Sequence, residues 1–331
     1  MPERVQWRRR RYGIAVITVI GLALVTYAAV RVLQPPAARF LEYPLRDRQA
    51  APIAIAAAGD GSIWFTIDHA DAIGRWRGGR VEWLPTPGPN FDPLGLAVAA
   101  DGSAWYTDLA AGAIVRMAPS GQTSQFALGS PIVRLGRLAV APDGSVWFAD
   151  VTGYGITELN NGTFKQHAIA AGAEGPYGVA VAADGTVWAT VQKGSKLVRI
   201  APGGSMEMID LPRRDAVPTD IAVAGDGAVF FLEFRANRLG RLRQGEFSEF
   251  AVASENAGLS GLAVAPDGSV WFGMVRHASL GRFRDGKVET FRLPRANARP
   301  YSVAVDRDGN VWYADISGYI GALLAGDAAG P

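Results

Sequence analysis

The chain has 331 residues, of which 49% are hydrophobic, and this is enough for a large buried core. It contains no cysteine, which excludes disulfide bonds and thiolate metal sites. Its formal net charge of +2 comes from the N-terminus, because residues 1–31 hold six arginines and one glutamate and the remainder holds 27 basic and 30 acidic groups, about −3. With no basic stripe to hold a phosphate backbone, nucleic acid is not expected as a partner.

The N-terminal segment predicts a membrane anchor. Residues 1–12 carry five arginines, and the stretch Gly13–Val30 that follows has no charge. A basic flank before an apolar run of this length predicts a transmembrane helix over residues 13–33, with residues 1–12 in the cytoplasm and the rest of the chain in the periplasm or outside the cell. Cleavage near residues 26–28 and secretion is the alternative, but the apolar run exceeds the roughly 7–15 residues of a signal peptide.

A linker of residues 34–39 leads into a unit that occurs seven times. Each copy is an apolar run, an Asp-Gly turn and a second apolar run with an aromatic residue four positions after the aspartate, and successive copies lie 41 or 42 residues apart. The aspartates are Asp60, Asp101, Asp143, Asp184, Asp226, Asp267 and Asp308, and the aromatics are Trp64, Trp105, Trp147, Trp188, Phe230, Trp271 and Trp312. Such regular spacing indicates a repeat architecture.

Each repeat continues with two further strand-like runs. In the sixth repeat these are residues 279–283 and 287–293, joined by a turn at Asp285–Gly286. Four short antiparallel strands in 41 or 42 residues match one β-propeller blade. The first two runs are apolar on both faces, as expected for blades stacked face to face. We therefore predict an all-β, seven-bladed propeller over residues 40–325; a solenoid, the alternative, would need polar caps at both ends.

The seventh repeat lacks a fourth strand, because the C-terminal tail, residues 326–331, is too short and too rich in glycine and alanine to supply one. Residues 40–45 resemble the outer strand at residues 288–293. The N-terminal strand is therefore expected to complete the last blade, which removes the exposed sheet edges and leaves a monomeric ring. An arginine near the third strand of five blades, for example Arg75 or Arg282, is expected to lie on a solvated outer face.

The start of the first strand and the end of the second lie at one face of a propeller, around its channel. Six residues before the repeat aspartate the chain carries a small residue in five repeats, but Arg137 and Asp220 in the other two. Tyr177 and Tyr301 occupy the preceding position in two repeats. These four residues are predicted to bind a ligand together with Asp108, Asp150 and Asp315, and a structural Arg137–Asp220 ion pair is the alternative.

Seven residues after the repeat aspartate the second strand ends in a carboxylate in four repeats, at Asp108, Asp150, Glu233 and Asp315. Converging carboxylates suit a cationic ligand or a hard cation such as Mg²⁺, for which Asp108, Asp150 and Glu233 are the candidates. The alternative is that each carboxylate caps its own loop.

Two histidines, His69 and His277, follow second strands on the same face and are candidate general bases, with Glu233 as their acidic partner.

The unit at residues 261–272, followed by Leu-Gly-Arg-Phe at residues 280–283 and Val-Glu-Thr-Phe-Arg-Leu-Pro at residues 288–294, resembles the streptogramin (virginiamycin B) lyase family. The resemblance covers residues 40–325 and implies a seven-bladed propeller. In that family the lyase opens a cyclic depsipeptide antibiotic by elimination, with a histidine base and a magnesium ion held by glutamates. The nearest match to its acid-x-His sequence is Glu233-Phe234-Arg235, which keeps the acid and has arginine at the position of the base.

These features together predict a membrane-anchored, extracytoplasmic propeller that binds or senses a small molecule or an envelope protein. One alternative is a magnesium-assisted carbon–oxygen lyase that uses His277 or His69 with Glu233. The other is a scaffold for envelope proteins.

Overall fold

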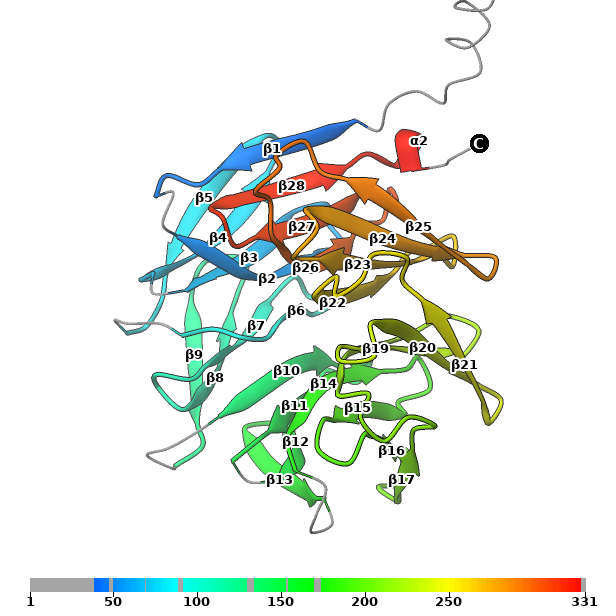
Figure 1. The fold of residues 1–331 in the computed structure, drawn as a ribbon. Helices are drawn as coiled ribbons and strands as arrows, with labels where there is room; N and C mark the ends of the chain where they lie inside the picture. The colour runs from blue at the N-terminus through cyan, green and yellow to red at the C-terminus, as the bar shows by residue number, and fades with distance from the viewer. Residues whose placement is uncertain are drawn as a thin grey trace, which may run out of the picture. The chain divides into compact units, whose positions relative to one another are not determined.

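The computed structural model describes residues 39–47, 50–68, 70–88, 92–129, 134–152, 154–169 and 174–328. Residues Phe40–Ala325 form one compact unit of seven four-stranded antiparallel sheets, arranged as the blades of a propeller (Figure 1). The prediction of an all-β, seven-bladed propeller is thereby confirmed.

Each of the first six blades is a run of four consecutive strands. Blades 1 to 3 are β2 (Ala51–Ala57), β3 (Ile63–Asp68), β4 (Ala72–Arg77) and β5 (Arg80–Pro85); β6 (Leu96–Val98), β7 (Ala104–Asp108), β8 (Ala113–Met117) and β9 (Thr123–Ala127); and β10 (Leu135–Val140), β11 (Val146–Asp150), β12 (Gly155–Asn160) and β13 (Thr163–Ala168). Blades 4 to 6 are β14 (Pro176–Val181), β15 (Val187–Val191), β16 (Lys196–Ile200) and β17 (Met206–Asp210); β18 (Pro218–Val223), β19 (Val229–Glu233), β20 (Arg238–Arg243) and β21 (Glu246–Ala251); and β22 (Leu259–Val264), β23 (Val270–Met274), β24 (Ser279–Arg284) and β25 (Lys287–Arg292).

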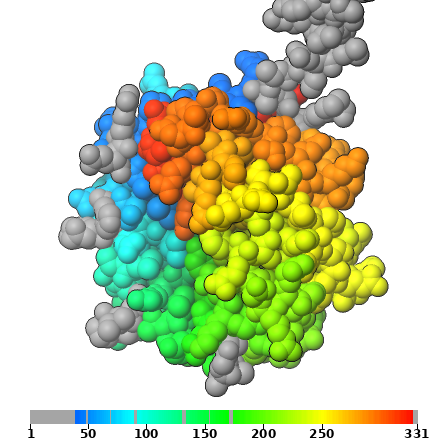
Figure 2. Space-filling model, in the orientation of Figure 1, coloured from blue at the N-terminus to red at the C-terminus, as the bar shows by residue number. Residues whose placement is uncertain are grey.

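The seventh blade joins the two ends of the domain. It consists of β26 (Pro300–Val305), β27 (Val311–Asp315), β28 (Tyr319–Leu323) and the N-terminal strand β1 (Phe40–Pro44), which pairs antiparallel with β28. Figure 1 shows β1 beside β28, and in Figure 2 blue N-terminal atoms adjoin red and orange C-terminal ones. The Tyr43 ring stacks on Trp312 with 6.3 Å between ring centroids, and Leu45 is buried. The predicted closure through the N-terminal strand is confirmed.

The Asp-Gly turns are stabilised by the repeat aspartate itself. In blade 1 the Asp60 carboxylate accepts hydrogen bonds from the backbone N–H and the hydroxyl of Ser62, and these bonds lower the pKa of Asp60. Gly61 has φ +84°, which glycine adopts without strain. In blade 7 Asp306 takes over this role, because its carboxylate accepts hydrogen bonds from the backbone N–H groups of Asp308 and Asn310.

Aromatic side chains and glycines set the packing within and between blades. In blade 6 a Cβ at Gly281 would overlap the Phe272 ring, so the third strand needs a glycine where this ring lies against it. In three blades a recurring arginine lies over the repeat tryptophan: in blade 6 the Arg282 guanidinium lies 5.5 Å from the centroid of the Trp271 ring. Arg282 is only 5% exposed, so the expectation of a solvated outer face is wrong for this arginine.

The described residues include one short helix, α2 (Ala325–Ala328), and none of them belongs to a helix long and apolar enough to cross a membrane. The predicted anchor at residues 13–33 and the cytoplasmic tail at residues 1–12 lie outside the described residues.

Candidate functional site

The first strands of the blades surround a central channel that is nearly filled. Its cavity has a volume of about 130 Å³ and is lined at one end by Arg137 and Asp220. In six blades the first strand shifts register near its channel end, a bulge that turns side chains toward the axis. The small residues there are required by close approach of neighbouring blades, because a Cβ at Gly178 would lie 2.5 Å from the carbonyl oxygen of Thr219.

Arg137 and Asp220 meet across this channel. Arg137 extends from β10 of blade 3 and its Nε donates a 2.9 Å hydrogen bond to Oδ1 of Asp220 on β18 of blade 5. The Nη1 of Arg137 donates to the carbonyl oxygen of Leu94 at 2.8 Å, and Oδ2 of Asp220 accepts from the backbone N–H of Gly261 at 3.0 Å. Each of the two charged residues is 9% exposed. One ion pair thus connects blades 2, 3, 5 and 6 at the axis.

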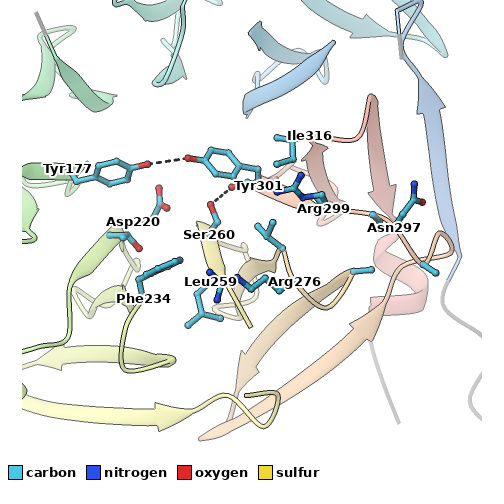
Figure 3. Close-up of a pocket in the computed structure, with 16 residues that line it drawn as sticks. Tyr177, Asp220, Phe234, Leu259, Ser260, Arg276, Asn297, Arg299, Tyr301 and Ile316 are labelled. Atoms are coloured by element: carbon cyan, nitrogen blue, oxygen red, sulfur yellow. Dashed lines mark hydrogen bonds between the residues drawn. The ribbon is translucent and has the colours of Figure 1, made fainter. Parts of the chain in front are cut away.

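Tyr177 and Tyr301 complete the cluster. Their hydroxyl oxygens lie 3.5 Å apart, and Figure 3 shows the two rings end to end with Asp220 beside them. The Arg137 guanidinium lies 5.9 Å from the Tyr177 ring centroid and 5.6 Å from that of Tyr301. Burial alone would lower the pKa of Arg137, but attraction by Asp220 and the tyrosines raises it, while burial raises the pKa of Tyr177. All four predicted ligand-binding residues of the channel mouth therefore lie together.

A pocket of about 610 Å³ opens beside this cluster. Its lining includes Tyr177, Asp220 and Tyr301 from the cluster and Phe234, Arg276 and Arg299 from neighbouring loops (Figure 3). The last three were not predicted from the sequence as ligand-binding residues. Loop comparison between repeats could have pointed to Arg299, because glycine stands at the same distance before Tyr177 in blade 4 as Arg299 does before Tyr301 in blade 7.

Three of the four carboxylates at the ends of second strands have interactions of their own. Asp108 accepts a hydrogen bond from the backbone N–H of Ala111 at 3.0 Å. Asp315 is fully buried, accepts from the backbone N–H groups of Arg299 and Ser317 and forms an ion pair with Arg295. Asp150 also takes part in a polar or electrostatic interaction. Asp108 and Asp315 therefore bond to their own loops, the alternative that the sequence left open.

Glu233 differs from the other three carboxylates. It is fully buried at the end of β19, and neither carboxylate oxygen has a hydrogen-bond partner among the described residues. Burial raises the pKa of Glu233 to about 7, helped by the negative charge of Glu249 and opposed by Arg213 and Arg238.

The surroundings of Glu233 do not suit the magnesium ion that the family resemblance implies. Glu249 already pairs with Arg213, at 2.9 Å, and with Arg238, at 3.7 Å between Nε and carboxylate oxygen. Within the described part of the chain no three His, Asp or Glu side chains lie close enough to hold a metal ion. Two guanidinium groups thus supply the positive charge near these carboxylates, and we derive no chemical step through a metal.

Of the two candidate histidines, His277 is described, and it is not brought to Glu233. His277 is exposed and its Nε2 lies 2.9 Å from the backbone oxygen of Glu255; its neighbours Arg276 and Ala278 line the pocket, but His277 does not. His69 lies outside the described residues.

Fold and site together define a seven-bladed propeller with a plugged channel and a ligand-sized pocket at one face. The chain belongs to the virginiamycin B lyase family, whose sequence profile matches residues 35–161 and 81–328. It is 34% identical to a virginiamycin B lyase of Nocardia farcinica over 213 residues, 64% of this chain and 73% of the relative.

Solved structures of the same family show the same fold. A streptogramin B lyase structure aligns with a TM-score of 0.81 and 27% identity, covering 86% of this chain and 96% of that one. A catalytically inactive histidine-to-alanine variant of Staphylococcus aureus virginiamycin B lyase with quinupristin aligns with a TM-score of 0.81 and 23% identity, covering 86% of this chain and 99% of that one. The resemblance stated from the repeat unit is thereby confirmed.

Proposed function

We propose that this chain is a ligand-binding member of the family and that it does not act as a streptogramin lyase. The observation that carries this proposal is the 610 Å³ pocket beside the plugged channel, whose rim holds Phe234, Tyr177 and Tyr301. A concave site of this size with aromatic walls and a few polar groups is typical of small-molecule binding. Phe234 is 42% exposed and lines this pocket, so a ligand bound there would cover its ring.

Among the described residues no base is placed for elimination chemistry. Elimination requires a base that reaches a proton next to a carbonyl group, and a group that stabilises the enolate. In Glu233-Phe234-Arg235, the nearest match to the family's acid-x-His sequence, arginine takes the place of the histidine, and a guanidinium stays protonated at any accessible pH. Glu233 has a pKa raised to about 7, but it is fully buried and does not line the pocket. The exposed His277 bonds to the Glu255 backbone instead.

We further propose that the propeller lies outside the cytoplasm and is held to the membrane by residues 13–33. The support is the arginine-rich segment of residues 1–12 followed by the uncharged run Gly13–Val30. A ligand in the pocket would then be a molecule of the periplasm or the cell exterior, and its recognition could serve sensing.

Quinupristin turnover by the full chain tests the first proposal. We expect no ring opening with or without added Mg²⁺, while quinupristin or smaller aromatic compounds raise the melting temperature of the wild type and not of Phe234→Ala. The matched control is Phe247→Ala, an aromatic residue on β21 outside the pocket lining. Turnover that disappears in His277→Ala or His69→Ala would overturn the proposal in favour of the lyase.

A further inference from the structure

We propose that the pocket binds an organic anion, a carboxylate or phosphate carried on an apolar or aromatic body. This inference rests on the proposed function and names the class of ligand. It starts from the charges of the lining, which holds three charged side chains: Asp220, Arg276 and Arg299.

The one acidic group of the lining is already neutralised. Oδ1 of Asp220 accepts from Arg137, and Oδ2 accepts from the backbone N–H of Gly261. Arg137 lies behind the pocket wall and is 9% exposed, so the ion pair turns no net charge toward a ligand. Asp220 therefore does not attract a cationic ligand.

The two basic groups, Arg276 and Arg299, have no acidic partner among the described residues. Arg276 donates a hydrogen bond to the side-chain oxygen of Asn256, and its guanidinium lies 5.9 Å from the Phe234 ring centroid. The backbone N–H of Arg299 bonds to Asp315, whereas its guanidinium forms no ion pair with any described residue. Both arginines are exposed at the pocket, so their N–H groups are available to a bidentate anion.

The remaining walls are apolar. Leu259, Val275 and Ile316 line the pocket together with the Phe234 ring and the tyrosines (Figure 3). An inorganic ion would leave these surfaces uncovered, and a neutral apolar molecule would leave the two guanidinium groups without a partner. An anionic group on an apolar body satisfies both parts of the lining.

Dansylglycine and dansylglycinamide form a probe pair that differs only in a carboxylate and a carboxamide. Fluorescence anisotropy of each is titrated with the full chain in a non-ionic detergent, against detergent alone. We expect the wild type to bind dansylglycine at least about tenfold more tightly, because hydrogen bonds between charged groups are the stronger ones. The preference is expected to shrink as NaCl is added, since these arginines are exposed.

The double variant Arg276→Gln/Arg299→Gln should bind both probes equally, with an unchanged melting temperature. Arg292→Gln, a change at an exposed arginine of β25 outside the pocket lining, should keep the preference. Equal affinity of the wild type for both probes, with binding lost in Phe234→Ala, would overturn the anion inference and leave the proposed function standing. Binding of neither probe, or binding that Phe234→Ala does not weaken, would count against the proposed function itself.

Discussion

The Arg137–Asp220 pair gives the sharpest test of how the ring is held together. Asp220→Asn keeps the shape of the side chain and removes its charge. Arg137, 9% exposed, would retain the Leu94 carbonyl and the two tyrosine rings as its partners, and its Nη2 has no hydrogen bond even in the wild type. Removing one member of a buried ion pair costs about 3–5 kcal/mol. Because the tyrosine faces still interact with the cation, we expect a loss of about 3 kcal/mol.

The reverse change, Arg137→Met, should cost a similar amount, since it leaves the Asp220 carboxylate with the Gly261 N–H as its one remaining described partner. The double variant Arg137→Met/Asp220→Asn leaves no unpaired charge at the axis. Its loss should fall short of the sum of the two single losses by about 2 kcal/mol or more.

Urea unfolding of the four proteins at neutral pH, followed by tryptophan fluorescence, measures these free energies. A loss below about 1 kcal/mol for Asp220→Asn, or additive losses in the double variant, would refute the reasoning from buried charge. The affinity of Arg137→Met/Asp220→Asn for dansylglycinamide shows whether the ion pair has a structural role or a role in ligand binding. Unchanged affinity makes the pair structural, whereas lost affinity in a folded double variant makes it part of the binding site.

Three further predictions concern the closure, the buried acid and the anchor. Deletion of residues 40–45 should expose the edge of β28 and remove the Tyr43–Trp312 stack, so the melting temperature should fall markedly or the protein aggregate; an unchanged melting curve would disprove closure. Burial raises the pKa of Glu233 to about 7 from its ordinary value of 4.5, so the native state holds a proton that the unfolded chain releases, and stability falls as pH rises from about 4.5 to about 7. Glu233→Gln should abolish this loss of unfolding free energy, which is at most about 3 kcal/mol, in urea titrations between pH 4.5 and 7. An unchanged pH dependence of stability in the variant would show that Glu233 does not cause the loss. Alkaline phosphatase fused after Pro331 should be active and stay with membranes after a carbonate wash, and a mature N-terminus near Ala29 would instead mean a cleaved signal peptide.

The repeat made the fold predictable because each blade is specified within some 40 residues of sequence. Asp60 bonds to Ser62 two residues away, and Gly281 accommodates Phe272 on the adjacent strand, so the information is local. Closure by residues 40–45 was predictable for another reason: the last repeat lacked its fourth strand, and a strand-like segment precedes the first repeat.

The site was only partly predictable, because its contacts join blades that are distant in sequence. Arg137 and Asp220 stood out against small residues at the same repeat position, yet their contact spans 83 residues and skips a blade. The orientation of Arg276 and Arg299 toward one pocket depends on loop conformations and rotamers that repeat spacing does not report. Sequence alone also showed carboxylates at the strand ends without their partners, and so left a cation site and loop capping both open.

Blade 7 shows what those carboxylates do when they are fully paired. Arg295 lies between Asp315 at the end of β27 and Glu42 on β1, and the Tyr313 hydroxyl donates a 2.9 Å hydrogen bond to Glu42. Because Glu42 belongs to the N-terminal strand, this network ties the strand that closes the ring to the loop before β26. The closure thus depends on charge as well as on backbone hydrogen bonds.

Blade 5 repeats the arrangement with two changes. Arg213 follows a Leu-Pro pair as Arg295 does, and Glu249 lies opposite Gly240 as Glu42 lies opposite Gly321. Phe231 stands where blade 7 has Tyr313 and offers no hydroxyl, and Glu233, one methylene longer than Asp315, is left without a hydrogen bond. An arginine lies among the carboxylates in both blades, so a guanidinium is the common partner that the described residues supply. Burial raises the pKa of Glu233, the acid left over in blade 5, to about 7, so this group takes up a proton more readily than an exposed glutamate.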